Sequence, residues 1–132
     1  MPVTELVWFR NDLRLGDNPA LTAACAEKRP VEACFLVAPG QWRSHDWSPN
    51  RTELLLRSLE TLGQSLAERG IPLHIKTMDG FDETDNALLA LCRERGIERI
   101  HANEEYAVNE RTRDHRLNRE LKANGIAFNI YR

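Results

Sequence analysis

Short runs of apolar, β-branched and aromatic residues alternate along this chain with longer amphipathic stretches. The short runs predict strands at residues 5–9, 32–37, 73–76, 99–102 and 127–131. The longer stretches predict helices at residues 19–27, 49–69, 83–95 and 108–123. In the second helix, leucines recur on one face, at Leu55, Leu59, Leu62 and Leu66. Glycines follow the last three helices, where a left-handed residue ends a helix at little cost, at Gly70, Gly96 and Gly125.

Strands that alternate with helices are typical of a parallel α/β sheet. We therefore predict a Rossmann-like, doubly wound sheet of five parallel strands in the order 3-2-1-4-5, with helices on both faces. Residues 1–132 fit one such domain. In this order the sheet has a switch point between strands one and four, and ligands bind outside the carboxyl ends of the strands there. We expect three segments to meet at that point: residues 10–18, 38–48 and 103–109.

Composition narrows the class of protein. The formal net charge is −2, with 20 acidic against 18 basic residues, so the domain as a whole does not attract nucleic acid. Three cysteines without C-x-x-C spacing predict buried free thiols rather than a zinc site or a disulfide. No apolar run approaches the ~18 residues of a membrane span, and no signal peptide is visible. We expect a cytoplasmic chain without membrane or metal.

Motifs for nucleotide binding and nucleophilic catalysis do not occur. The sequence lacks G-x-G-x-x-G, G-x-x-x-x-G-K-[ST], G-x-S-x-G and H-E-x-x-H, so we assign no catalytic residue. His74, His101 and His115 lack the spacing of metal ligands, and we expect them on strand or helix surfaces.

The fourth predicted helix is unusually polar. Between residues 109 and 122 only Leu117 and Leu121 are large and apolar, so we expect little burial against the sheet. Two interpretations stay open: a solvated outer helix, or a helix whose arginines meet a second domain.

The loop after the first strand is the most distinctive part of the sequence. Residues 8–18 read W-F-R-x-D-L-R-L-x-D-N, and Asn18 with Pro19 predicts the cap and first position of a helix. This pattern resembles, nearly letter for letter, the amino-terminal signature of the photolyase/cryptochrome family. We expect its charged residues to form an ion-pair and cap network that stabilises the loop or docks it on another domain: Arg10, Asp12, Arg14 and Asp17.

Two further motifs resemble those of folate-binding photolyases. Residues 106–111 match Y-x-V-N-E-R, and residues 42–49 match W-x-x-H-x-x-S-P in the long loop after the second strand. The resemblance implies a methenyltetrahydrofolate antenna, with His45, Asn109, Glu110 and Trp42 as candidate binding residues. A carboxylate and an amide match the N–H donors and carbonyl of a pterin edge. From the residues alone, Asn109 and Glu110 could equally cap the helix, and Trp42 could pack its loop.

The resemblance also implies a function. It points to the N-terminal, antenna-binding domain of a DNA photolyase that repairs cyclobutane pyrimidine dimers, a carbon–carbon lyase in which the antenna passes energy to a reduced FAD. FAD and damaged DNA would bind a C-terminal helical domain absent from this chain. The chain alone is expected to be catalytically inactive. Its role would be to hold the antenna and to dock on that domain, and without that domain we expect its antenna site to be empty or weakly occupied. The alternatives are a cryptochrome-type blue-light receptor domain, a stand-alone nucleotide-binding α/β module and a flavodoxin-like electron carrier.

Overall fold

The chain folds around one parallel sheet. The computed structural model describes residues 4–10, 13, 15–16, 18–26, 28–37, 49–77, 84–103 and 108–131, with the backbone alone at residues 49–51, 84–85 and 108–113. The strands are β1 (Thr4–Phe9), β2 (Val31–Val37), β3 (Leu73–Thr77), β4 (Ile97–Asn103) and β5 (Ala127–Tyr131). They form a five-stranded sheet in the order β3-β2-β1-β4-β5, and every neighbouring pair is parallel. The predicted fold and strand order are confirmed.

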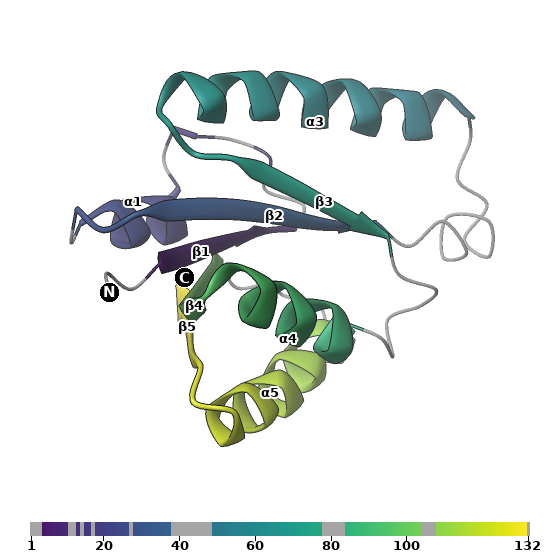
Figure 1. Cartoon of the computed structure of the whole chain (residues 1–132). Coiled ribbons are helices and arrows are strands. Elements are labelled where there is room, and N and C mark those ends of the chain that lie inside the picture. Colours follow the sequence, from purple (N-terminus) through teal and green to yellow (C-terminus); the bar gives the residue numbers. More distant parts are fainter. Residues whose placement is uncertain are drawn as a thin grey trace.

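Helices cover both faces of this sheet. The helices α1 (Pro19–Cys25) and α3 (Pro49–Glu68) lie on one face, and α4 (Thr84–Arg95) and α5 (Val108–Ala123) lie on the other (Figure 1). Observed bounds agree with the predicted ones within about two residues. The strand β4 begins at Ile97, earlier than predicted, because Gly96 ends α4 with a φ of +69° and the chain enters the sheet at once.

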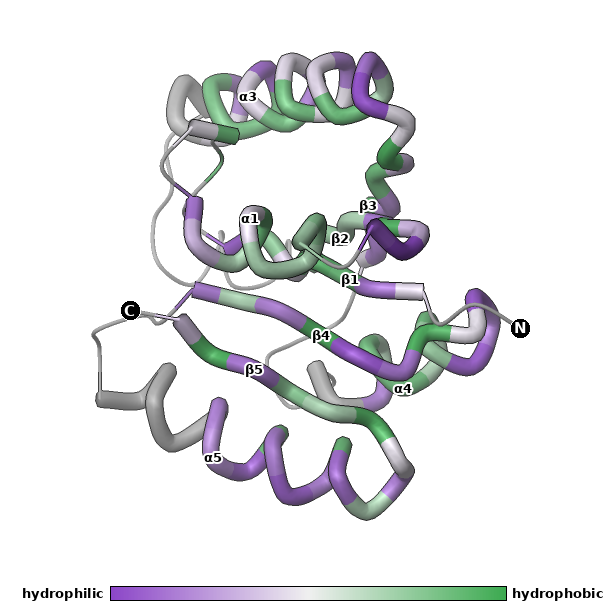
Figure 2. The backbone as a smooth tube through the Cα atoms, turned by 90° about the vertical axis from the view of Figure 1, so that its left-hand side faces the viewer, coloured by the Kyte–Doolittle hydropathy of each residue, from purple (hydrophilic) through white to green (hydrophobic). Residues whose placement is uncertain are grey.

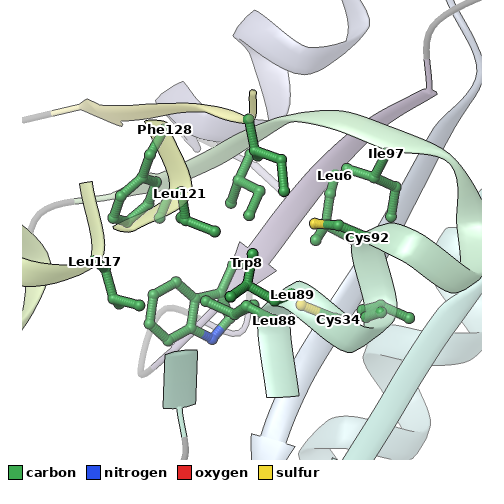
Figure 3. Packing of buried hydrophobic residues seen from close by; sticks show 14 of the residues in the cluster. Leu6, Trp8, Cys34, Leu88, Leu89, Cys92, Ile97, Leu117, Leu121 and Phe128 are labelled. Atoms are coloured by element: carbon green, nitrogen blue, oxygen red, sulfur yellow. The ribbon is translucent and has the colours of Figure 1, made fainter. Parts of the chain in front are cut away.

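The central strand β1 contributes to the cores on both faces. Leu6 and Trp8 pack on the side of α4 and α5, whereas Val7 and Phe9 pack on the side of α1 and α3. Figure 3 shows the first of these cores, in which Trp8 lies near Leu117 of α5. A strand buried on both faces reads as a continuous apolar run, and each large side chain buried there contributes about 1.5–3 kcal/mol.

The polar helix α5 packs on its own sheet more tightly than its composition predicts. Leu117 and Leu121 are completely buried, and Asp114 is buried beside them. The other side chains from residue 115 to residue 123 are exposed, and Figure 2 shows this helix as mostly hydrophilic. The expectation of little burial was therefore wrong, because a stripe of two leucines on one face is enough to seat the helix.

The cysteines separate into two groups. All three are free thiols, but Cys25 is exposed on the short helix α1, which corrects its predicted burial. Cys34 and Cys92 are buried as expected, and burial raises the pKa of Cys92 to about 12 and that of Cys34 further still. Across the described ranges, no helix is both long and apolar enough to cross a membrane.

Candidate functional site at the carboxyl edge of the sheet

A buried polar cluster lies at the switch point of the sheet, where β1 and β4 end side by side. It joins Arg10, directly after β1, with Asn103 at the end of β4. It also includes Asn18, which caps α1, and Asp114 of α5. We call these four residues the carboxyl-edge cluster. Because ligands of doubly wound sheets bind outside the carboxyl ends of the strands at such a point, this is the candidate site.

Arg10 is the centre of the carboxyl-edge cluster. Its Nη1 donates to Oδ1 of Asp114 at 2.7 Å, and the two side chains are only 5% and 10% exposed. Its Nη2 donates to the backbone carbonyl of Asn103. The guanidinium also lies 4.8 Å from the ring centroid of Trp8, within cation–π range. A charge this deeply buried is tolerated because it is paired and hydrogen-bonded.

The cluster continues around the end of the sheet to its other face. Nδ2 of Asn103 donates to Oδ1 of Asn18 at 2.8 Å, and Oδ1 of Asn103 accepts from the backbone N–H of Ala20 at 3.0 Å. Asn18 Oδ1 also accepts from the N–H of Leu21 at 3.1 Å. These bonds satisfy donors that the first turn of α1 would leave unpaired. One network thus ties α5 on one face, through two strand ends, to α1 on the other.

The predicted loop network is confirmed in part. Arg10 does form an ion pair and Asn18 does cap the helix, with its side chain accepting from Leu21. The partner of Arg10 is Asp114, 104 residues further along the chain, and the sequence did not identify it. Asp12, Arg14 and Asp17 lie outside the described residues.

The structure describes the predicted ligand-binding residues only in part. Asn109 and Glu110 stand in the first turn of α5, as predicted, but the structure describes only their backbone. Trp42 and His45 belong to residues 38–48, which lie outside the described part of the chain. The antenna contacts assigned to all four residues stay predictions. Within the described residues, no group of three or more histidine, cysteine or acidic side chains could hold a metal ion.

A second buried cluster crosses the middle of the sheet. Nε2 of His101 lies 3.2 Å from Oε1 of Glu5, and Nδ1 of His101 lies 2.8 Å from the hydroxyl of Tyr131. His101 is therefore buried between β1 and β5, which corrects its predicted surface position. Burial, and then the charge of Glu5, raises the pKa of Tyr131 above its ordinary value.

A third cluster lies at the opposite, amino edge of the sheet. Oε1 of Glu32 on β2 lies 2.5 Å from Nε2 of His74 on β3 and accepts from Nε of Arg95 at 2.8 Å. Burial by itself raises the pKa of Glu32, but the hydrogen bonds from Arg95 and His74 outweigh it and leave the pKa below its ordinary value. We call these three residues the amino-edge cluster. His74 is thus half-buried in a hydrogen bond with Glu32, whereas His115 is exposed as predicted.

Comparison with known proteins agrees with this fold and these motifs. The family model for DNA photolyase matches residues 5–131, so the chain belongs to the DNA photolyase family. A deoxyribodipyrimidine photo-lyase of Escherichia coli is 42% identical over 120 residues, which cover 90% of this chain and 25% of that protein. The chain therefore spans about a quarter of the length of this relative.

Solved structures of photolyases and cryptochromes are similar to this chain as well. A cryptochrome of Synechocystis superposes with a TM-score of 0.84 at 28% identity, over 98% of this chain and 27% of that one. A photolyase of Sulfolobus tokodaii superposes with a TM-score of 0.80 at 25% identity, over 98% of this chain and 29% of that one. The α/β domain described here thus recurs as one part of longer photolyases and cryptochromes.

Proposed function

We propose that this chain is the antenna-holding domain of a light-driven DNA-repair lyase. It would bind 5,10-methenyltetrahydrofolate at the carboxyl edge of the sheet, through Asn109 and Glu110 together with His45 and Trp42. The observation that carries the proposal is the buried ion pair of Asp114, which fastens α5 to the switch point one turn after the Asn109–Glu110 pair.

The residue types of this site fit a folate. A pterin edge offers adjacent N–H donors and a carbonyl, which the carboxylate of Glu110 and the amide of Asn109 complement. A position in the first turn of a helix also stabilises an anionic carboxylate. Bound folate would absorb near-ultraviolet or blue light and supply excitation energy to a flavin. The residues of this chain would bind and orient it and take no part in bond cleavage.

The remaining parts of the activity lie outside these 132 residues in this proposal. FAD and the pyrimidine dimer would bind a C-terminal helical domain, on which this domain docks, as the length of the relatives allows. The net charge of −2 supports this division, because the phosphate backbone is recognised by basic surfaces. In this proposal the protein acts in the cytoplasm, and the isolated chain would be catalytically inactive.

The identity of the antenna has one competitor. The Sulfolobus tokodaii photolyase contains two FAD molecules, and a novel light-harvesting cofactor is inferred for it. A flavin is therefore the alternative candidate for the antenna of this fold. The Asn109–Glu110 pair favours the pterin, since it matches a compact donor edge.

A fluorescence titration of the chain with methenyltetrahydrofolate tests the proposal. We expect saturable binding that Glu110→Ala abolishes and that Glu120→Ala, an exposed carboxylate later in the same helix, leaves unchanged. A parallel titration with FAD should show weaker binding. Tighter binding of FAD would replace the pterin by a flavin, and no binding of either ligand up to millimolar concentration would refute the role as antenna holder.

The similarity to the Synechocystis cryptochrome supports a second candidate, a blue-light receptor domain. The two candidates share the fold and differ in the reaction of the whole protein. Repair of cyclobutane dimers in irradiated DNA by the complete protein under blue light would support the lyase. Flavin reduction by light without any repair would support the receptor.

A further inference from the structure

The side chain of Arg10 makes two contacts, one before and one after the segment that contains Asn109 and Glu110. The Nη2 of Arg10 binds the carbonyl of Asn103, the last residue of β4, and its Nη1 binds Asp114 in the second turn of α5. Residues 104–113 run between these two points. A single guanidinium therefore holds both ends of the connection that contains the Y-x-V-N-E-R sequence.

Helix register links this anchor to the candidate ligand-binding position. Asp114 shares one face of α5 with Leu117 and Leu121, and all three are buried. Position 110 stands one turn earlier on the same face, about 6 Å along the axis, given a rise of 1.5 Å per residue. The rotation of α5 that the Arg10–Asp114 pair fixes also fixes where position 110 stands at the sheet edge.

The pair anchors α5 in its second turn. Asp114 is buried there, and the two buried leucines lie three and seven residues later. On the other side, Arg10 follows the most central strand and lies over Trp8 in the core. The ion pair thus connects the end of the central strand to the second turn of α5.

We propose that Arg10 and Asp114 are positioning residues of the antenna site, which hold residues 108–113, at the start of α5, in the conformation that binds the ligand. This inference rests on the proposed function, because it acts through Asn109 and Glu110. Pre-ordering of a binding segment raises affinity by removing the cost of ordering it when the ligand binds. The pair contributes to binding without touching the ligand.

The test compares Asp114→Asn with Glu32→Gln in the 132-residue chain. Both substitutions neutralise a buried, arginine-paired carboxylate, but Glu32 lies at the opposite edge of the sheet. For each variant we would measure the affinity for methenyltetrahydrofolate and the amide hydrogen exchange of residues 108–114. The temperature is one at which both variants are fully folded by circular dichroism.

We expect Asp114→Asn to weaken folate binding about tenfold and to speed exchange at residues 108–114, with the strands unaffected. Glu32→Gln should change neither the folate affinity nor the amide exchange of residues 108–114. Equal affinities for the unmodified chain and Asp114→Asn would overturn the inference and leave the proposed function intact. If the unmodified chain binds no folate, the proposed function fails, and unchanged exchange in Asp114→Asn would then refute the ordering role as well.

Discussion

The two edges of the sheet use similar chemistry for different purposes. Each has a buried carboxylate paired with an arginine, Asp114 with Arg10 at the carboxyl edge and Glu32 with Arg95 at the amino edge. The carboxyl-edge pair is sealed on both sides, whereas Arg95 is 43% exposed. Water can therefore take over the role of Glu32 for Arg95, but it cannot reach Arg10 in the same way.

The two clusters also differ in what they connect. The amino-edge cluster joins the neighbouring strands β2 and β3 to the end of α4. The carboxyl-edge cluster joins helices on opposite faces through the ends of β1 and β4, at the switch point of the sheet. Position relative to the switch point, and not the presence of an ion pair, separates a candidate site from a structural contact.

The largest effect should come from Asp114→Ala, which leaves the guanidinium of Arg10 buried without its carboxylate. We expect a loss of about 3–5 kcal/mol in the free energy of unfolding, measured by urea denaturation. Glu53→Ala is the matched control, because the Arg57–Glu53 pair has the same N–O distance of 2.7 Å but is exposed. It should cost at most about 0.5 kcal/mol. Equal losses would remove burial as the reason for the difference.

A smaller effect is expected at the amino edge, from Glu32→Gln. The loss should be on the order of 1 kcal/mol at neutral pH, since Arg95 can turn into water. The folded-state pKa of Glu32 lies below its ordinary value of 4.5, so its contribution is complete above pH 4.5 and is lost as the pH falls through the folded pKa.

The difference in unfolding free energy between the unmodified chain and Glu32→Gln should therefore shrink on acidification below pH 4.5. Urea denaturation at a series of pH values measures it. A difference that stayed constant down to pH 2 would contradict the lowered pKa and would make the amino-edge cluster an ordinary set of neutral hydrogen bonds.

Hydrophobic periodicity was sufficient to predict the strands and helices, because each of them has its own apolar pattern. The strand order was taken from the Rossmann-like class and did not follow from periodicity. The carboxyl-edge cluster was only half predictable. Arg10 and Asn18 belong to a local signature. The partner Asp114 could not be identified in the same way, because it faces Arg10 only in one rotation of α5 about its axis. The spacing of Asp114 to Leu117 and Leu121 indicates that rotation only once the helix is known to pack on the sheet.

Strand register explains the error at His101. Polar residues at 99, 101 and 103 alternate along β4, a pattern that is typical of a solvated face. Register instead sets His101 opposite Val7 and Asn129, within reach of Glu5 and Tyr131. The neighbours that cover a polar side chain depend on how its strand pairs with the adjacent strands. The sequence of a single strand does not determine this pairing.

The cluster of Glu5, His101 and Tyr131 lies between the two edges of the sheet. It extends the comparison of the two edges to a side chain that is neutral at physiological pH, the phenol of Tyr131. Burial and then the Glu5 charge raise the pKa of Tyr131 above 10, so its contribution to stability is complete below pH 10 and is lost as the pH rises through the folded pKa. In Tyr106→Phe, Tyr131 is the only tyrosine left, and phenolate absorbance near 295 nm should titrate with a midpoint above 10. Adding Glu5→Gln should lower this midpoint, because the buried negative charge opposes a phenolate beside it. A midpoint at 10 in both variants would mean that the phenol is exposed to water in solution, and that only Glu5 and His101 of this cluster are buried.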